Sequence, residues 1–93
     1  MDNPEGKKDK RYLVESPHSA VQCAHALKQI GARGFITRFN WACKSGIHTG
    51  WAIFEAESEQ EAMNILPPFL RATAKVTKVD LFRPDEVESW QDG

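Results

Sequence analysis

Residues 34–56 read GFITRFNWACKSGIHTGWAIFEA, and this stretch decides the predicted fold. Residues 34–44 alternate between apolar and polar side chains, which is typical of a half-buried strand. Thr49–Ala56 alternates in the same way, and Ser45-Gly46 between them is a turn signal. The stretch therefore predicts a β-hairpin.

A two-residue turn at Ser45-Gly46 pairs Trp41 with Gly50 and Phe39 with Ala52. This register sets large residues against small ones on one face, as a packed core layer requires. A three-residue turn would exchange the two faces of the hairpin. With the two-residue turn, the opposite face carries Arg38, Asn40, Trp51, Ile53 and Glu55.

Before the hairpin, residues 11–15 predict a short strand, and a helix is expected to follow. Ser19 can cap this helix together with Gln22 three residues on, and Ser16 is an alternative start. Gly31 is the expected left-handed end of the helix. Its apolar stripe consists of Ala20, Cys23, Ala24, Leu27 and Ile30.

After the hairpin, Ser58 and Glu61 form a capping box at the start of a second helix. Pro67-Pro68 must break or kink that helix, because proline supplies no backbone donor. Residues 74–83 alternate again and predict a final strand, which Pro84 ends.

The order strand–helix–strand, strand–helix–strand is that of two split βαβ units. The sequence therefore predicts an α+β, ferredoxin-like sandwich: a four-stranded antiparallel sheet with two helices on one face. We expect residues 1–10 to be a disordered tail, residues 11–84 the domain and residues 85–93 an acidic tail.

The sheet face without helices is predicted to carry Trp51, Ile53 and either Phe82 or Tyr12. An exposed sheet face with this much apolar area usually marks an interface. We therefore expect a homodimer through the open sheet face, with each contact made twice across a two-fold axis.

The composition excludes several classes of protein. The 93 residues are 41% hydrophobic and 27% charged, with a formal charge of −1, which excludes a strongly basic nucleic-acid binder. No apolar run approaches the ~20 residues of a membrane span, and the first ten residues have no apolar secretory region. Two cysteines in unrelated contexts favour a reducing compartment, so we expect a cytoplasmic protein.

Cys43 and His48 face each other across the predicted turn, as in a nucleophile–base pair or half of a metal site. A metal site needs three or four ligands, and only His18 and His25 remain as nitrogen donors. We therefore predict no metal site and no cofactor. Cys43 is expected to be a small core residue.

The open face offers a second group of polar side chains. Arg38 is predicted to orient an anionic or carbonyl group, Asn40 to donate a hydrogen bond to it, and Trp51 to supply the apolar wall. His48 and Glu55 are candidates for proton transfer in any reaction at this face. Cross-strand ion pairing on a solvated surface is the alternative interpretation.

Thr49–Ala56 also has the shape of a strand of the RNA-recognition motif. Thr49 replaces the basic residue of that motif, and Ile53 replaces its second stacking aromatic. Since Trp51 is the one stacking platform, we predict no binding of nucleic acid and keep a single-stranded RNA binder as a further alternative.

In the order of their elements, residues 11–84 resemble the dimeric α+β barrels of the muconolactone-isomerase-like type, most closely over residues 48–84, and small uncharacterised bacterial domains look similar too. The resemblance lies in Phe54-Glu55-Ala56, Ser58 to Ala62 (SEQEA), Leu66 to Phe69 (LPPF) and Arg83-Pro84. It implies two sheets that stack face to face and enclose pockets, with activities that range from isomerases and monooxygenases to plain ligand binders. Only His48 and Glu55 lie in matching strand positions, and the longer first half of the isomerases is lacking.

These observations predict a small dimeric domain that binds a small anionic or aromatic molecule between its sheet face and the partner subunit. They leave open whether the protein is an enzyme. The alternative is an interaction module whose open sheet face serves only assembly.

Overall fold

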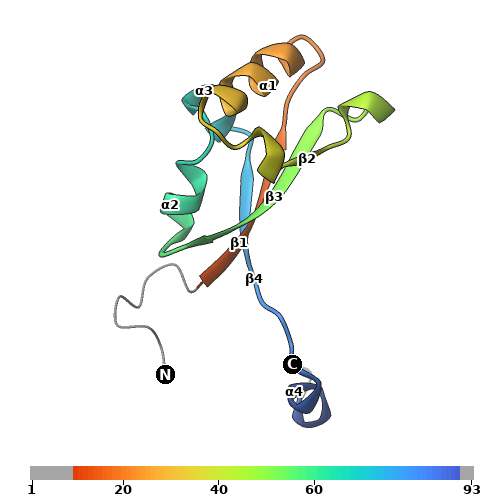
Figure 1. Cartoon of the computed structure of the whole chain (residues 1–93), viewed down its shortest axis with the longest axis vertical. Coiled ribbons are helices and arrows are strands. Elements are labelled where there is room, and N and C mark those ends of the chain that lie inside the picture. Colours follow the sequence, from red (N-terminus) through yellow and green to blue (C-terminus); the bar gives the residue numbers. More distant parts are fainter. Residues whose placement is uncertain (1–9, 91–93) are drawn as a thin grey trace.

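Two eight-residue strands, β1 and β3, lie at the centre of a four-stranded antiparallel sheet of order β2-β3-β1-β4 (Figure 1). This computed structural model describes residues 10–90; residues 1–9 and 91–93, which belong to the predicted tails, lie outside the described residues. The fold is α+β, as predicted. The strands are β1 (Lys10–Pro17), β2 (Asn40–Trp41), β3 (Thr49–Ala56) and β4 (Lys75–Val79).

Three α-helices pack on one face of the sheet and form the core with it (Figure 1). They are α1 (Cys23–Ala32), α2 (Glu59–Met63) and α3 (Pro68–Arg71), and a fourth helix, α4 (Pro84–Ser89), lies beyond the end of the sheet. Within residues 10–90, no helix lies over the opposite face of the sheet (Figure 1). We call that opposite face the open sheet face; it carries Arg11, Leu13, Glu15, Trp51, Ile53, Glu55, Lys75, Thr77 and Val79.

The core takes every second residue of the central strands. The buried residues are Gly50, Ala52, Phe54 and Ala56 on β3 and Tyr12, Val14 and Ser16 on β1. Tyr12 belongs to this set and is 6% exposed, so the expectation that it might join the open sheet face is wrong. The period of two in a strand places Tyr12 on the same side as Val14, under the helices.

The predicted register of the hairpin is confirmed: Trp41 pairs with Gly50, and Asn40 pairs with Trp51. The indole of Trp41 lies directly on Gly50, where an added Cβ would meet Trp41 ring carbons at 2.6 and 2.7 Å. Gly50 is therefore required for close approach of this ring to the strand.

The long strand predicted over residues 34–44 is wrong except at β2. Residues Ile36–Arg38 form a 3₁₀ turn, η1, and Cys43–Ser45 form a second, η2, so the predicted two-residue turn is a longer loop. The bend at η1 returns Phe35 to within 5.5 Å of the Phe54 ring, measured between centroids, and Phe39 lies 5.8 Å from the same ring. A straight strand would carry Phe35 past this core, so burial of aromatic area overrides the alternating pattern.

The predicted capping bonds of Ser19 and Gln22 form, but they close the turn before the first helix, which begins at Cys23 with Gln22 as its N-cap. The Gln22 amide donates to Ser19 Oγ at 3.2 Å, and the Ser19 amide donates to Gln22 Oε1 at 3.0 Å. Gly34, at φ +86°, takes the left-handed position that was expected at Gly31. Ala26 and Ile30 are the buried residues of α1, whereas Ala20 and Ala24 of the predicted stripe are exposed.

The second capping box and the proline break are confirmed. The Glu61 amide donates to Ser58 Oγ at 3.1 Å at the start of α2. The helix ends at Met63, and α3 begins at Pro68, so the two prolines separate two short helices.

The last strand is shorter than predicted and ends at Val79. Its pairing with β1 ends at Arg11–Val79, close to the first residue of β1, so residues 80–83 have no strand to pair with. Beyond the last strand, α4 lies away from the sheet (Figure 1), and Val87 and Trp90 are exposed. No helix within residues 10–90 has the length and apolar character needed to cross a bilayer.

We expect Gly50→Ala to lower the free energy of unfolding by about 1–3 kcal/mol, because the new methyl group overlaps the Trp41 ring. Gly31→Ala is the matched control: its Cβ meets Ile36 at 3.9 Å, and it should stabilise α1 by about 0.5–1 kcal/mol. Urea unfolding followed by fluorescence measures both. Equal effects of the two substitutions would contradict the proposed role of Gly50.

Candidate metal centre

Four potential metal ligands lie together at the end of the sheet where β1 ends and β3 begins. They are His18, Cys23, Cys43 and His48, and their ligand atoms all lie within 4.8 Å of one another. All four side chains are half-buried. Two thiols and two imidazoles at this separation form a donor set typical of tetrahedral zinc.

The strand register brings three of the four ligands together. The β1–β3 ladder ends at Pro17–Thr49, so the next residues, His18 and His48, lie opposite each other, and the His18 amide donates to the His48 carbonyl at 2.9 Å. On the other side, the β2–β3 ladder holds the loop that contains Cys43 in η2, and Cys43 Sγ lies 3.5 Å from His18 Nε2.

The fourth ligand comes from the first residue of α1. Cys23 follows directly on the turn that Ser19 and Gln22 close by their reciprocal hydrogen bonds. This turn carries the chain from β1 back over the sheet end, so Cys23 lies above His18. The cluster therefore joins three segments that are far apart in the sequence: the end of β1, the start of α1 and the β2–β3 loop.

The ring of His18 is oriented as a metal-bound histidine usually is. Its Nδ1 lies 3.2 Å from the Ser16 carbonyl oxygen, which can only accept, so Nδ1 carries the proton and donates. The free lone pair is then on Nε2, which lies 3.5 Å from Cys43 Sγ. A histidine that binds a metal through one ring nitrogen often donates the N–H of the other to a backbone carbonyl, which fixes the tautomer in this way.

A buried nitrogen without a partner among the described residues favours a bound cation in this cluster, and the raised pKa of a thiol means that the cation must displace a proton from sulfur. His48 Nδ1 is buried and has no hydrogen-bond partner within residues 10–90, which is costly for a polar atom. Burial raises the pKa of the Cys43 thiol, and the neighbouring Cys23 thiol raises that pKa further. Coordination would give the nitrogen a partner and let both sulfurs carry charge next to a cation.

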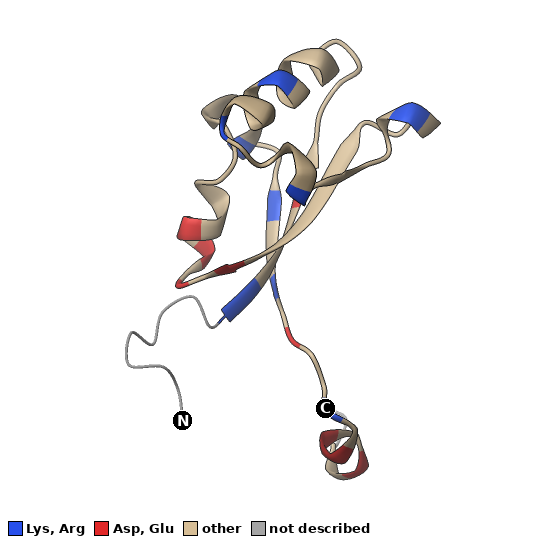
Figure 2. Ribbon diagram, in the orientation of Figure 1, with Lys and Arg blue, Asp and Glu red and all other residues tan. Residues whose placement is uncertain are grey.

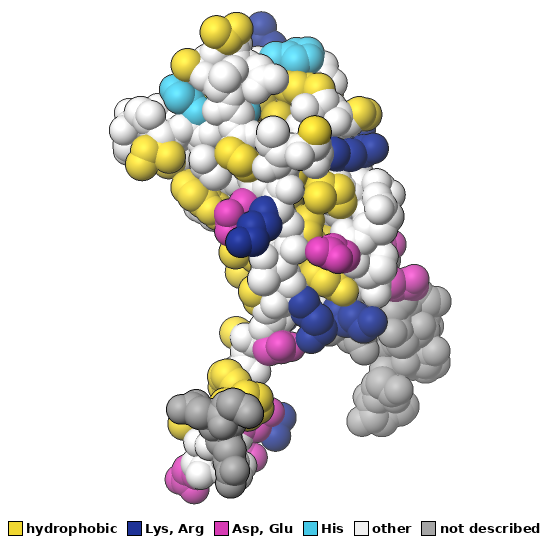
Figure 3. Space-filling model, turned by 180° about the vertical axis from the view of Figure 1, so that it is seen from behind, with side chains coloured by type: hydrophobic (Ala, Val, Ile, Leu, Met, Phe, Trp, Pro, Cys, Tyr) yellow, Lys and Arg dark blue, Asp and Glu magenta, His cyan; other side chains and the backbone are white. Residues whose placement is uncertain are grey.

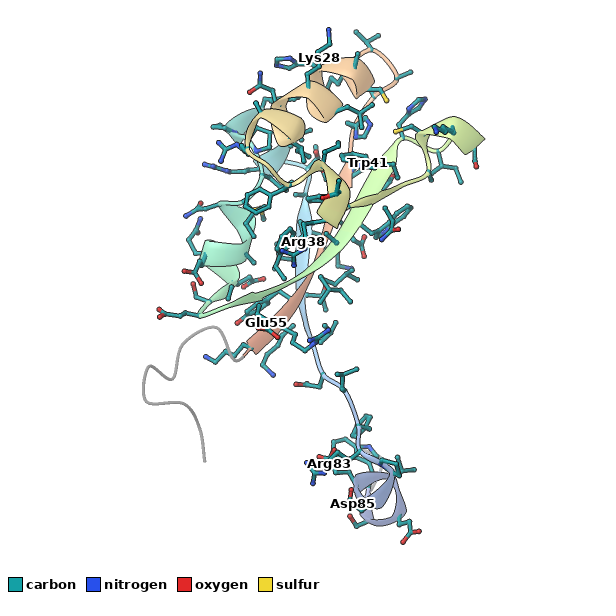
Figure 4. All side chains as sticks on the ribbon, in the orientation of Figure 1. Lys28, Arg38, Trp41, Glu55, Arg83 and Asp85 are labelled. Carbon is teal, nitrogen blue, oxygen red and sulfur yellow. The ribbon has the colours of Figure 1, made fainter. Side chains whose placement is uncertain are left out.

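Trp41 forms an apolar wall of the cluster. Its ring stands edge-on to the His18 imidazole, with centroids 6.1 Å apart, and stacks on Phe39 at 5.3 Å (Figure 4 labels Trp41). A hydrophobic shell of this kind limits the access of water to the donor atoms.

The sequence indicates only part of this donor set. The predicted hairpin pairs Cys43 with His48 and leaves His18 and His25 as further nitrogen donors, whereas Cys23 was predicted to lie in the apolar stripe of the helix. His25 instead lies over the Phe69 ring, with centroids 4.5 Å apart. The signal that finds the set is the mirrored pattern H-x₄-C (18–23) and C-x₄-H (43–48), with both pairs in loops next to strand ends.

Arg38, predicted to bind a ligand, has partners within its own chain. It comes from η1, donates from Nη2 to the Ile53 carbonyl at 3.3 Å and lies 4.5 Å from the centroid of the Phe54 ring (Figure 4). Because β2 pairs only with Gly50 and Trp51, the edge of β3 beyond them lacks a strand neighbour in the described sheet. The guanidinium covers this edge, which otherwise offers unpaired backbone groups.

The other residues predicted for ligand binding lie apart from one another. A cavity of about 350 Å³ on the β3 side of the open sheet face is lined by Arg11, Arg38, Ile53, Phe54 and Glu55. Glu55 forms an ion pair with Arg11 at 3.6 Å. Asn40 and Trp51, which pair with each other in the β2–β3 ladder, do not line the cavity.

The two candidates for proton transfer do not form one site. His48 continues the helix-facing side of β3, whereas Glu55 lies on the open sheet face. They are seven positions apart in an extended segment, about 23 Å at 3.3 Å per residue. One substrate cannot contact both side chains at that separation.

Comparison with protein-family models, with curated proteins and with solved structures finds no match for this chain. A functional proposal for this chain therefore rests on the geometry of the site.

We expect Arg38→Ala to lower the free energy of unfolding by about 1–2 kcal/mol, because it removes a charge-assisted hydrogen bond and a cation–π contact. Arg33→Ala, at an exposed arginine after α1, should change it by less than about 0.5 kcal/mol. Chemical unfolding of both variants tests this. An unchanged midpoint for Arg38→Ala would show that the guanidinium does not support the β3 edge.

Proposed function

We propose that this chain is a zinc-binding domain in which His18, Cys23, Cys43 and His48 hold one metal ion. The observation that carries the proposal is the separation of the four donor atoms, all within 4.8 Å of one another. In a tetrahedral zinc site, bond lengths of about 2.0–2.3 Å place the donors about 3.3–3.8 Å apart. Small side-chain rotations therefore suffice to bring these atoms onto one ion.

The donor types favour zinc over other divalent ions. Two thiolates and two imidazoles are soft and borderline ligands, whereas Mg²⁺ and Ca²⁺ require carboxylate, carbonyl or water oxygen. Four protein ligands also fill the coordination sphere of zinc and leave no position for a reacting water, as in structural sites. The role supported best is therefore structural.

A structural metal fits the size of the domain. A chain of 93 residues buries only about 60–65% of the surface that its unfolded form exposes, so its core is thin. The candidate ligands come from the end of β1, the start of α1 and the β2–β3 loop. One ion would therefore join the helical layer to the sheet end, in addition to the hydrophobic contacts.

Zinc titrated into the chelator-stripped full chain should bind at one ion per chain. At free zinc 100-fold above Kd, the free energy of unfolding should rise by about 2.7 kcal/mol. Cobalt should give the visible absorption of a tetrahedral site and a thiolate charge-transfer band. Calorimetry, thermal unfolding and absorption spectra measure these effects in a non-thiol reductant.

Matched variants distinguish this site from adventitious binding. Cys23→Ser and His18→Gln should each weaken zinc binding by more than about 100-fold. Loss of a group that only hydrogen-bonds a metal ligand already weakens metal binding by about 10–100-fold. His25→Gln removes a histidine outside the cluster and should bind zinc like the wild type. Zinc binding that survives Cys23→Ser unchanged, or an absence of binding in the wild type, would refute the proposal.

We further propose that the fold is ferredoxin-like and related in arrangement to the dimeric α+β barrels. The order of the elements, the antiparallel sheet β2-β3-β1-β4 and the helices on one face support this relation. The open sheet face, with Trp51 and Ile53 on it, supports a homodimer through that face. A cytoplasmic location fits two free cysteines in a metal site.

A second candidate function is the binding of a small anionic molecule in the cavity next to Arg38. Its support is the cavity of about 350 Å³, a volume within the range of ligand sites, with two guanidinium groups in its lining. A partner subunit over the open sheet face would enclose it. The alternative, an interaction module without ligand, needs no such cavity.

Native mass spectrometry of the purified chain tests this second function. A retained small molecule should appear with the wild type and with Arg33→Ala, and it should be lost in Arg38→Ala, because Arg38 lines the cavity. Circular dichroism checks that both variants are folded. A wild-type spectrum without any bound molecule contradicts ligand binding and leaves assembly as the role of the open sheet face.

A further inference from the structure

The segment after β4 carries apolar side chains that the body of the molecule does not cover. We call residues 80–90 the C-terminal arm; it consists of an extended link and α4 (Figure 1). Leu81, Phe82, Val87 and Trp90 in this arm are 53–75% exposed. Phe82 and Trp90 contact each other at 5.0 Å between ring centroids, and with Val87 they line a hollow of about 190 Å³.

The arm is poorly suited to stand alone. A helix of six residues is far below the ~12–15 residues at which isolated helices become even marginal in water. Its acidic first turn, the capping box and Pro84 favour the helix locally but bury no apolar area. An amphipathic element of this length requires a surface to pack against.

The open sheet face offers an apolar surface of the required kind. Leu13, Trp51, Ile53 and Val79 lie on it, and charged side chains flank them. In the space-filling view, hydrophobic side chains run down the body between charged ones, and a separate hydrophobic group lies on the arm (Figure 3). Neither surface is covered within residues 10–90.

The arm and the body carry opposite net charges. The arm has four acidic residues and one basic residue, whereas residues 10–79 have nine basic and five acidic residues. Figure 2 shows acidic residues on α4 and also on α2, with basic residues spread over the body. On the open sheet face itself, Arg11 and Lys75 lie beside Glu15 and Glu55, and Arg38 lies at its β3 edge.

The direction of the arm disfavours docking on the sheet of the same molecule. The link continues in the direction of β4 and carries α4 past the end of the sheet (Figure 1). A return to the same molecule requires a reverse turn within residues 80–83, Asp-Leu-Phe-Arg, which contain no glycine and lead into Pro84. The open sheet face of a second molecule can be reached without such a turn.

We propose that two copies of this chain exchange their C-terminal arms, so that α4 of each copy docks on the open sheet face of the other. This inference is independent of the zinc site and goes beyond the proposed dimer, because it names the segment that each subunit contributes. The exposed parts of the four apolar side chains give roughly 400 Å² per arm. Two arms on two faces then bury about 1,600 Å², the size of a stable interface.

Light scattering coupled to size exclusion tests the exchange with the full chain at ~100 μM or above. The wild type should have twice the mass of the 10.5 kDa chain. Trp90→Glu in the arm and Ile53→Glu on the open sheet face should each give a folded monomer. Val21→Glu, at a side chain 93% exposed on the body, is the matched control and should remain a dimer.

A mixture of the two monomeric variants gives the decisive result. The Trp90→Glu copy keeps an intact face and the Ile53→Glu copy keeps an intact arm, so an equal mixture should form dimers through one remaining contact. A wild-type monomer would overturn the exchange. So would a Trp90→Glu variant that stays dimeric while Ile53→Glu does not, because this pattern indicates direct stacking of the two sheets.

Discussion

The structure depends on one close contact: the indole of Trp41 lies on the backbone of Gly50, where no side chain stands in its way. This contact fixes the register of the short strand β2 against β3. Because side chains alternate along a strand, a shift of β2 by one residue would turn Trp41 toward the open sheet face and Asn40 toward the core, while the ladder with β1 holds the faces of β3. The short β2–β3 ladder also brings the loop that carries Cys43 close to His18 at the end of β1, so the packing of one aromatic ring contributes to the candidate metal centre.

The candidate metal centre lies at the end of the sheet, outside its hydrogen-bonded ladders. The β1–β3 ladder ends at Pro17–Thr49, and beyond it the chain continues as loops and the first turn of α1. Loops contribute little apolar burial, so a small domain gains much from a cross-link at such a place. A hydrogen bond fixes the His18 ring, and the edge of Trp41 limits its movement, which reduces the conformational freedom that a metal ion would have to remove.

The two faces of the sheet carry different kinds of side chains. The helix-covered face contains the core, and alternation of small and large residues on β3 makes room for Phe35, Phe39 and Trp41. The open sheet face keeps a stripe of apolar residues between charges, and the C-terminal arm keeps another. At the edge of β3, Arg38 lies over Phe54 and donates to the Ile53 carbonyl, so a charged side chain covers backbone that could otherwise pair with another strand.

The sequence by itself determined the elements whose signals are local. The alternation of Thr49–Ala56, the capping bonds of Ser19 and Ser58, the break at Pro67-Pro68 and the large-to-small pairing of Trp41 with Gly50 are all confirmed, because each depends on residues close in the chain or on one register. Only the tertiary structure decided the bend at η1, since the gain from packing Phe35 and Phe39 on Phe54 outweighs strand propensity. It also decided the cluster of Cys23 with His18, Cys43 and His48. Two of these pairs are visible in the sequence as H-x₄-C and C-x₄-H, but their meeting depends on how β1, β3 and α1 pack, and spacing along the chain does not contain that information.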